Sequence, residues 1–352
     1  MGGFTQDGAP FSLAVVIPNR NDSKYLPACL RSIVSQEVKP DELIIIDDES
    51  TDDSVAVIRR ELAGHPFARL EINPKNLGGV QTANLGLRLA RSKFVLFMGA
   101  NDFILPGHFA RMKACLERFP HSGLWSGMVW LVDEQDRYIR MHPSPVIALG
   151  DAFFSGASCR TMVRRFGSWL TGQTTVYRRE ALLESGALDP SLKGLNDLLA
   201  ALVVASRYGA AFSPAPVGVM RIHAGAFLPA TLQDSAELDR ILGEVRARGP
   251  KVEPALFTQQ VLDRTEQRFY FASLRLSGGA TLAHIKRRSG PIRRALLDIA
   301  GRVPGRFERL RVGLFFVAMR PFDIVPTIWY RILGAGMVLL GEKLAGRAPP
   351  RT

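Results

Sequence analysis

Residues 94–106 read FVLFMGANDFILP, and the predicted fold is organised around this stretch. The apolar run at 94–98 is rich in strand-forming residues and ends at Gly99, which predicts a central strand buried on both faces. Asn101 and Asp102 follow at the turn. Open α/β sheets bind their ligands at the carboxyl ends of such strands, which makes Asp102 a candidate ligand-binding residue. The alternative is a turn residue that makes only local hydrogen bonds.

Three earlier strands and the helices between them are predicted from the spacing of apolar residues. The strands are expected at residues 12–17, 43–46 and 69–72. The helices are expected at residues 26–36, from residue 53 onwards, and at 80–90. This alternation predicts right-handed crossovers and a largely parallel sheet, so the polar residues that end the strands should share one edge.

Those polar residues are the first candidates for a binding site. They are Pro18, Asn19, Arg20 and Asn21 after the first strand, Asp47 and Asp48 after the second, and Asn101 and Asp102 after the fourth. Helix capping accounts for Ser50, Thr51 or Asp52 but not for Asp47 and Asp48. The sequence has neither G-x-G-x-x-G after its first strand nor a P-loop motif. Lone carboxylates at strand ends instead suit a base or ribose, and a divalent metal on a diphosphate.

The composition is that of a folded protein with its charge in one segment. The 352 residues are 47% hydrophobic, enough for one large domain and an appendage. Residues 286–352 contain fourteen Lys and Arg against four Asp and Glu, which is +10 of the net charge of +12. The three cysteines form no C-x-x-C pair and fit a reduced compartment as buried thiols. Residues 1–12 lack a secretory signal pattern, and no nucleic-acid-binding motif is visible.

Several motifs occur together and in order, and they carry a resemblance to a known family. They are VVIPNRN, LIIIDDESTDDS and NLGGVQTANLGLRLARSKFVLFMGAND. Over about residues 11–225, they resemble the family 2 inverting glycosyltransferases with the GT-A fold. The resemblance implies a Rossmann-like, mostly parallel sheet flanked by helices. We therefore expect a flexible N-terminus at 1–10, a GT-A domain at 11–229, and a helical, basic region at 230–352.

The resemblance implies a nucleotide-sugar site at the strand ends. Its predicted members are Pro18, Asn19, Arg20, Asn21, Asp47, Asp48, Asn76, Gly78, Asn84 and Asn101. Asp48 matches the acid that contacts the base. Asp102 matches the acid that binds Mg²⁺ or Mn²⁺ on the diphosphate of the donor, with a UDP-sugar as the first candidate. Gly99 and Asn101 stand where the family commonly has further aspartates, so we expect metal binding to depend on the sugar nucleotide.

The resemblance also implies an acceptor side at residues 172–209. A turn at Gly172, a short strand, a helix from Arg179 and a second helix beginning near Asn196 and Asp197 are expected there. Asp197 matches the general base that deprotonates the acceptor hydroxyl, which would give inversion in one step. Its alternative is an acid that complements the helix dipole.

One residue and one segment each allow two interpretations. His223 matches a histidine that reaches the metal or phosphate, or is structural. A turn is predicted at residues 133–136, and residues 137–168 are predicted to be irregular, as an acceptor loop or a surface excursion.

The C-terminal region has a different pattern. Helical spacing begins near residue 230, with a break at Gly249-Pro250. Basic clusters beyond Lys286 alternate with apolar runs at 312–319 and 332–341, each too short to span a bilayer. With Trp329 and Tyr330 beside them, they predict binding to an anionic membrane surface. A helical subdomain with a solvated basic face is the alternative.

Together these observations predict an inverting, metal-assisted glycosyltransferase. It would transfer a sugar from a nucleotide-diphosphate sugar to a hydroxyl of a glycan or lipid-linked acceptor, in the cytoplasm on the inner face of the membrane. One alternative is a noncatalytic nucleotide-sugar or glycan binding protein, which Gly99 and Asn101 favour. The other is a polyprenyl-phosphate sugar synthase, whose phosphate acceptor needs little help from Asp197.

Overall fold

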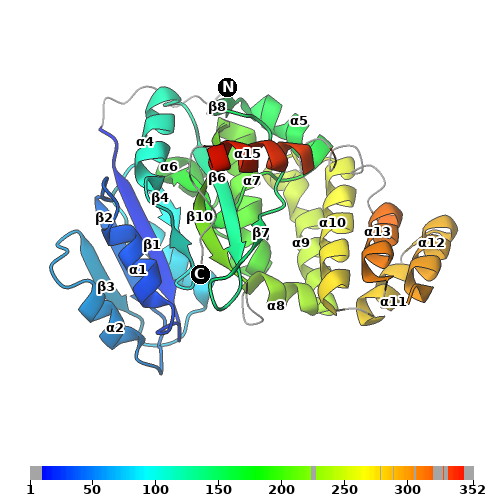
Figure 1. The fold of residues 1–352 in the computed structure, drawn as a ribbon, viewed down its shortest axis with the longest axis horizontal. Helices are drawn as coiled ribbons and strands as arrows, with labels where there is room; N and C mark the ends of the chain where they lie inside the picture. Colours follow the sequence, from blue (N-terminus) through cyan, green and yellow to red (C-terminus); the bar gives the residue numbers. More distant parts are fainter. Residues whose placement is uncertain are drawn as a thin grey trace.

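Residues 13–97 form the parallel half of the sheet, with helices on both faces (Figure 1). Its strands pair in the order β3-β2-β1-β4, and they are β1 (Leu13–Asn19), β2 (Glu42–Asp47), β3 (Ala68–Ile72) and β4 (Phe94–Phe97). They are connected by α1 (Leu26–Val34), α2 (Ser54–Glu61) and α3 (Gly79–Leu89). Side chains of β1 and β2 alternate between the two faces, so α1 and α2 cover one face and α3 the other. The predicted strand and helix order of this half is confirmed.

The second half of the sheet is mixed. The computed structural model describes residues 10–222, 227–277, 279–287, 289–304, 307–319, 328 and 332–344, and its ten-stranded sheet continues from β4 as β9-β6-β10-β5. The added elements are β5 (Phe103–Ile104), α4 (His108–Arg118), β6 (Leu124–Val132), β9 (Val176–Arg178) and β10 (Ala210–Arg221). The antiparallel strand β9 lies between β4 and β6, while β6 and β10 are parallel.

The segment at 137–168, predicted to be irregular, contains regular structure. It holds β7 (Tyr138–Met141), β8 (Ala152–Phe154) and α5 (Gly156–Phe166). The oxygen Ser155 Oγ accepts a hydrogen bond from the backbone N–H of Ser158 at 3.3 Å and begins the helix. Cys159, Met162 and Val163 then lie buried on one face of it. The prediction was wrong because this short helical spacing was overlooked.

Residues 172–208 follow the predicted order. They form the 3₁₀ turn η1 (Gly172–Thr174), strand β9, helix α6 (Arg179–Glu184), the 3₁₀ turn η2 (Pro190–Leu195) and helix α7 (Asn196–Tyr208). All three cysteines are free and buried, as expected.

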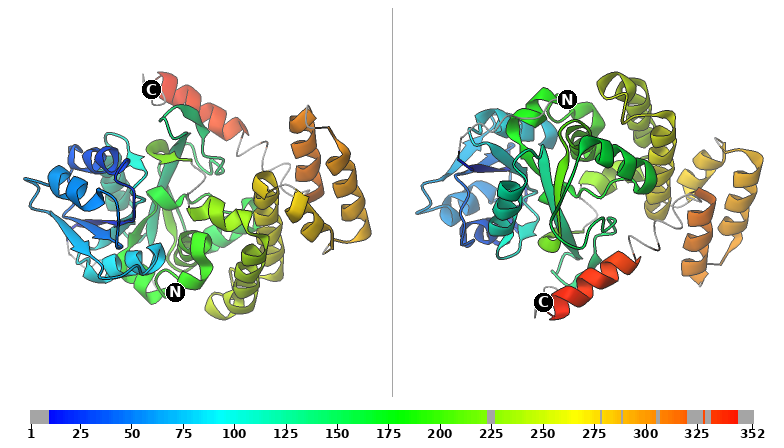
Figure 2. Two further views of the ribbon diagram at one scale, coloured as in Figure 1. Left: turned by 90° about the horizontal axis from the view of Figure 1, so that it is seen from below. Right: turned by 90° about the horizontal axis from the view of Figure 1, so that it is seen from above.

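The C-terminal helices extend the core of the sheet domain (Figures 1 and 2). They are α8 (Phe227–Gln233), α9 (Ser235–Val252), α10 (Gln259–Ser277), α11 (Gly279–Arg287), α12 (Pro291–Arg302), α13 (Glu308–Met319) and α15 (Gly334–Leu344). Leu238, Ile241 and Leu242 on α9 are buried in the same cluster as residues of α7 and β10. Helix α15 returns to the sheet domain, where Gly334 lies against Val146. None of the helices in the described ranges is long and apolar enough to cross a bilayer.

The predicted break at Gly249-Pro250 was also wrong. Helix α9 continues through Pro250 to Val252. Proline in the last turn of a helix removes only one backbone hydrogen bond, because the helix ends directly afterwards. A side chain at Gly249 would meet the ring of Phe257 at 2.8 Å, so glycine permits close packing there.

Candidate active site

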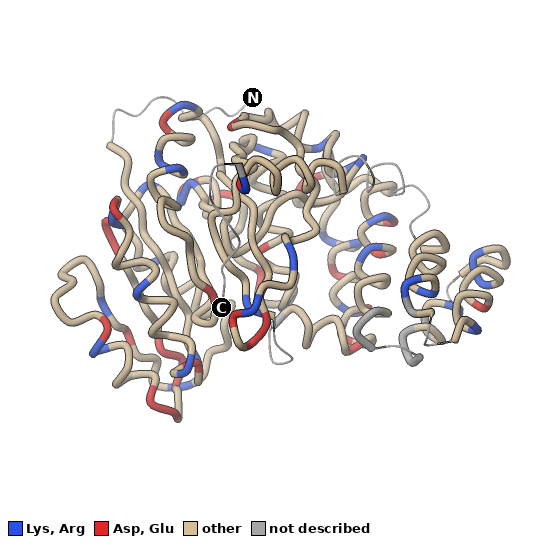
Figure 3. Tube along the Cα trace, in the orientation of Figure 1, with Lys and Arg blue, Asp and Glu red and all other residues tan. Residues whose placement is uncertain are grey.

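The parallel strands bring the predicted donor-site residues to one edge of the sheet. Asn19 and Asp47 are partners in the register of β1 and β2. Asp102 lies in the turn between β4 and β5, and Arg221 ends β10. Acidic residues gather at this edge, which is the lower edge in the view of Figure 3.

Asp47 braces the turns that follow β1 and β2. Its Oδ1 accepts a hydrogen bond from Asn19 Nδ2 at 2.8 Å, and its Oδ2 accepts one from the backbone N–H of Ser50 at 2.9 Å. Ser50 Oγ in turn accepts from the backbone N–H of Asn21 at 3.0 Å. The buried oxygen Asn19 Oδ1 has no hydrogen-bond partner among the described residues. A buried acceptor at the end of β1 is therefore left unsatisfied by those residues.

Asp48 is saturated by hydrogen bonds from the segment after β3. Its Oδ1 accepts from Asn73 Nδ2 and from the backbone N–H of Leu77, both at 2.8 Å, and its Oδ2 accepts from the backbone N–H of Gly78 at 2.8 Å. Burial alone would raise the pKa of Asp48, but these hydrogen bonds outweigh it and lower the pKa below its ordinary value. Asp48 is thus held as a charged group that fixes the 73–78 loop.

Three of the remaining predicted donor residues are exposed or partly exposed, and a fourth is hydrogen-bonded within the protein. Pro18 is partly exposed and Arg20 is exposed at the end of β1. Asn76 is exposed, and its Oδ1 accepts from the backbone N–H of Gly78 at 2.9 Å. Asn84, by contrast, donates to the carbonyl of Leu188 at 2.7 Å and accepts from its N–H at 3.1 Å. We therefore assign Asn84 to the packing of α3 on the loop before η2 rather than to the donor site, which corrects the prediction.

Asp102 is bonded much more sparsely than Asp48. Its side chain is 8% exposed, and its Oδ1 accepts one hydrogen bond, from the backbone N–H of Arg221 at 2.9 Å. No hydrogen bond to its Oδ2 is found in the described part of the chain. Burial raises the pKa of Asp102 to about 7; the Arg221 N–H and charge oppose this shift, and the negative charge of Asp22 adds to it.

Arg221 is the cation of the site, and sequence analysis missed it. Its side chain is 2% exposed and pairs with Asp136 Oδ1 at 2.6 Å. Its guanidinium also donates to the carbonyl of Asn101 and lies over the rings of Tyr25 and Phe103, 4.7 and 5.4 Å from their centres. Asp136 and Arg221 are 85 residues apart, and no local sequence feature pairs them. Only the parallel pairing of β6 with β10 brings them together.

The chemistry of Asp102 fits a divalent metal that is completed by other ligands. No group of three or more His, Cys, Asp or Glu side chains that could hold a metal is found within the described residues. Mg²⁺ commonly binds through one or two carboxylates, with waters and substrate phosphates as its other ligands. A carboxylate with one oxygen outside the hydrogen-bond network can serve in this way. His223, the other predicted metal residue, lies outside the described residues.

Asp197 lies against Gly172 at the start of α7. A Cβ on Gly172 would come within 2.0 Å of Asp197 Oδ2, so only glycine permits this approach. Asp197 Oδ1 accepts from the backbone N–H of Leu198 at 2.8 Å, and burial raises the pKa of Asp197. The hydroxyl of Tyr177 donates to the Asp197 carbonyl at 3.1 Å and helps to hold this turn. A carboxylate with a raised pKa and little hydrogen bonding is suited to accept a proton.

Gln173 connects the Asp197 region with the Asp102 region. Its Nε2 donates to the carbonyls of Phe103 and Val219, each at 2.9 Å. Phe103 directly follows Asp102, and Gly172 directly precedes Gln173. The side chain of one residue therefore joins the turn at Asp197 to the strand beside Asp102.

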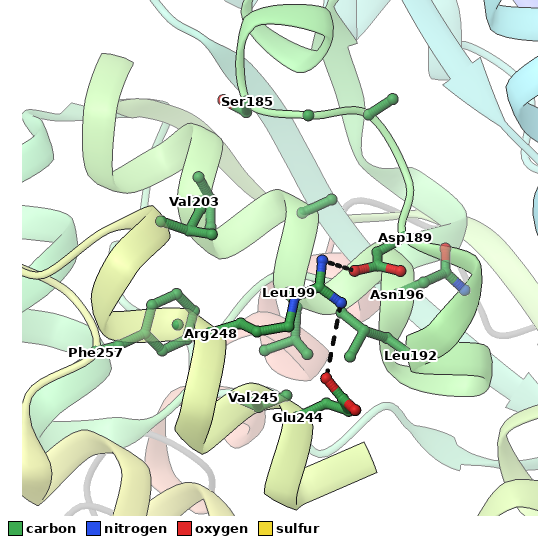
Figure 4. Close-up of a pocket in the computed structure, with 15 residues that line it drawn as sticks. Ser185, Asp189, Leu192, Asn196, Leu199, Val203, Glu244, Val245, Arg248 and Phe257 are labelled. Atoms are coloured by element: carbon green, nitrogen blue, oxygen red, sulfur yellow. Dashed lines mark ion pairs between the residues drawn. The ribbon is translucent and has the colours of Figure 1, made fainter. Parts of the chain in front are cut away.

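A separate cavity of about 160 Å³ lies between α7, α9 and the loop at 185–192 (Figure 4). Arg248 forms an ion pair with Asp189 at 2.8 Å across it. Asn196, predicted on the acceptor side, lines this cavity and donates its amide to the carbonyl of Lys193. The predicted donor residues do not line it, so the cavity is distinct from the strand-end site.

Comparisons with known proteins identify the family and the fold. The model of the glycosyl transferase family 2 matches residues 14–184. Chondroitin synthase from Escherichia coli is 33% identical over 107 residues, which cover 30% of this chain and 15% of that protein. The chain spans only part of the curated relatives that it matches, from 15% to 66% of their length.

Two solved structures share the fold. Staphylococcus aureus TarS 1–349 in complex with UDP-GlcNAc has a TM-score of 0.57 at 16% identity, with 97% of this chain and 93% of that chain covered. The mannosyltransferase PcManGT from Pyrobaculum calidifontis, in complex with GDP-Man and Mn²⁺, has a TM-score of 0.54 at 19% identity, with 89% and 86% covered. The mixed sheet with its flanking helices is thus the predicted GT-A fold, and the domain at residues 14–184 belongs to glycosyl transferase family 2.

Proposed function

We propose that this protein transfers a sugar, with inversion, from a nucleotide-diphosphate sugar to a hydroxyl group of a glycan or lipid-linked acceptor. The observation that carries the proposal is a pair of sparsely bonded carboxylates, Asp102 and Asp197, on turns joined by Gln173. The family match supports glycosyl transfer as the reaction class.

The donor would bind along the strand ends. The unpaired Asn19 Oδ1 is available to a donor group of the base, and the loop fixed by Asp48 would border it. A UDP-sugar is the first candidate because TarS was solved with UDP-GlcNAc, and a GDP-sugar is the second because PcManGT was solved with GDP-Man.

Asp102 would hold Mg²⁺ or Mn²⁺ through its Oδ2. PcManGT was solved with Mn²⁺, which supports a divalent metal in this fold. Such an ion would stabilise the negative charge of the departing diphosphate by several kcal/mol. Arg221, buried beside Asp102, adds a fixed positive charge at the same place.

Asp197 would be the general base. With its pKa raised by burial, its carboxylate binds a proton more tightly than an exposed aspartate does. Removal of the hydroxyl proton as the oxygen attacks the anomeric carbon would displace the nucleoside diphosphate from the opposite face, which inverts the configuration. General-base assistance contributes roughly 10² to 10⁴ in rate.

We place the reaction in the cytoplasm, at the inner face of a membrane whose anionic lipids attract the basic C-terminal region. The excess of Lys and Arg over residues 286–352 supports this location. A polyprenyl-phosphate sugar synthase would share the donor site, but its activity should depend little on Asp197, which Asp197→Asn tests. A noncatalytic binding protein would share the fold but would not turn over the nucleotide sugar.

The experiment is hydrolysis of a panel of nucleotide sugars by purified protein with Mg²⁺, Mn²⁺ or EDTA. We expect metal-dependent release of one nucleoside diphosphate, abolished by Asp102→Ala and retained by Asp133→Ala, a matched change on the exposed β6–β7 turn. Nucleotide stabilisation in a thermal shift without turnover would favour a noncatalytic protein or an obligatory acceptor. No stabilisation by any nucleotide would overturn the donor site.

A further inference from the structure

Helix α12 carries an exposed apolar stripe at the end of the molecule farthest from the parallel sheet (Figures 1 and 2). Ile292, Leu296 and Ile299 are 80%, 39% and 55% exposed, and their spacing places them on one side of the helix. Leu297 and Ala300 on another side are fully buried. The helix therefore packs on the protein through one face and leaves large apolar side chains without cover on another.

The charge around this stripe indicates what covers it. The described residues of α11, α12 and α13 contain seven Lys and Arg against two Asp and Glu, and basic residues predominate there in Figure 3. Arg287, Arg294 and Arg302 are exposed. An apolar stripe within a strongly basic group of helices is the pattern of a helix that lies in the interface of an anionic bilayer.

Two other occupants fit less well. A second copy of this surface would bring two strongly positive regions together, which opposes association. Nucleic acid would leave the apolar stripe exposed to water or phosphate. Helix α15 also exposes apolar side chains, Met337 and Leu340, but its Glu342 and Lys343 cancel in charge. Helix α13 exposes Leu310 and Val317 beside Arg309, so the basic, apolar surface of α12 continues onto its neighbour.

We propose that α12 lies flat on an anionic membrane, with Ile292, Leu296 and Ile299 in the acyl boundary and the exposed arginines at the lipid phosphates. Long arginine side chains reach headgroups while their helix lies at the boundary. This inference specifies the part of the chain that binds the membrane, and its biological meaning rests on the proposed function. Lipid binding itself does not require catalysis. It also gives the surface at which a lipid-linked acceptor would be presented.

The test is flotation of the full chain with vesicles of phosphatidylcholine, with and without about one third phosphatidylglycerol, in the absence of nucleotide. We expect binding to the anionic vesicles that weakens as NaCl rises from about 0.1 M, where the Debye length is near 10 Å. The variant Ile292→Asn/Ile299→Asn should lower the partition coefficient roughly tenfold or more. The matched control Leu149→Asn/Leu183→Asn, at exposed positions of the sheet domain, should bind as wild type.

Charge is tested separately with Arg294→Gln/Arg302→Gln, for which we expect a loss of roughly fivefold per arginine on anionic vesicles only. Equal binding of wild type and the Ile292 and Ile299 variant would overturn the proposal. The proposal would also be overturned if wild type did not bind vesicles but formed a concentration-dependent dimer that this variant abolishes. Asp102→Asn should lose activity yet bind vesicles as wild type does. Wild-type protein that floats with lipid but turns over no nucleotide sugar would refute the proposed function and leave this inference standing.

Discussion

The carboxylates Asp48, after β2, and Asp102, in the turn after β4, follow neighbouring parts of the same sheet but have opposite environments. Asp48 accepts three hydrogen bonds at 2.8 Å, which hold its pKa low. Asp102 accepts one, from Arg221, and burial raises its pKa to about 7. An aspartate after a strand thus stabilises the neighbouring loop in one case. In the other it keeps a carboxylate oxygen that no donor within the described ranges uses. What a carboxylate can do here depends on how many N–H donors surround it.

The largest effect is expected from Asp102→Asn. If Asp102 holds the metal, its loss should remove several kcal/mol of transition-state stabilisation, or roughly 10³-fold in kcat/KM. Steady-state kinetics with saturating Mn²⁺ measure this, and Asp53→Asn, an exposed acid after β2, is the control. A variant with more than a tenth of wild-type activity would mean that Asp102 is not the metal ligand.

The same substitution should change how stability depends on pH. Asp102 has a folded pKa of about 7 against an ordinary value of 3.8. Between these values the unfolded chain is ionised there while the folded chain stays protonated, so the folded state loses stability as pH rises from about 4 to 7. The loss is up to about 4 kcal/mol at 1.36 kcal/mol per pKa unit. Urea unfolding in EDTA measures the free energy of unfolding at pH 5 and at pH 8. The difference between the two pH values should be smaller for Asp102→Asn than for wild type, and equal differences would refute the raised pKa.

Asp48→Ala should instead destabilise the fold. It removes the acceptor of the Asn73 amide and the Leu77 and Gly78 N–H groups. Leaving such donors unsatisfied costs roughly 3 kcal/mol in total. Urea unfolding at pH 7 measures the loss, with Asp53→Ala as the exposed control. A loss below about 0.5 kcal/mol, the level of a surface change, would contradict the structural role of Asp48.

Gly172→Ala extends the comparison to the third carboxylate, Asp197. The new methyl group would meet Asp197 Oδ2 at 2.0 Å and displace the proposed base. We expect kcat to fall by roughly 10- to 100-fold, within the range for general-base catalysis, with little change in donor affinity. Gly150→Ala, where a methyl group meets nothing within 4 Å, is the control. Unchanged kcat would show that the position of Asp197 does not matter for the reaction.

The smallest effect is expected from Asp136→Asn. Arg221 would lose its ion-pair partner but keep the Asn101 carbonyl and the rings of Tyr25 and Phe103. Half-exposed ion pairs contribute up to about 1 kcal/mol, so nucleotide affinity should fall less than about fivefold. Calorimetry with UDP and Mn²⁺ measures this against Asp133→Asn on the same turn. A loss as large as that of Asp102→Asn would make Asp136 part of the metal site.

Much of the parallel half of the fold was predictable, because buried parallel strands appear as short apolar runs that end in polar turns. The runs before Asn19, Asp47 and Asp102 are of this kind. Helix α5 and the course of α9 through Pro250 were not predicted, since short helical spacing and a proline in a last turn are weak sequence features.

The site was predictable only in part, because side-chain partners come from distant elements. Asp48, Asp102 and Asp197 stand out in the sequence, but nothing local shows that Asp48 is saturated by a loop near residue 77. Arg221 meets Asp102 across 119 residues through the pairing of the sheet. Asn84 matched a motif, yet its amide holds Leu188. Motifs therefore located the edge of the sheet, whereas the roles within it depended on the tertiary structure.

The proposed function depends on Asp102 holding the metal that engages the donor diphosphate. The most direct measurement is calorimetric titration of UDP, and of GDP, into wild type, Asp102→Asn and Asp53→Asn at pH 8, with Mn²⁺ and with EDTA. We predict nucleotide binding that requires Mn²⁺ in wild type and Asp53→Asn and is lost in Asp102→Asn. Equally tight, Mn²⁺-dependent binding by Asp102→Asn would contradict the claim.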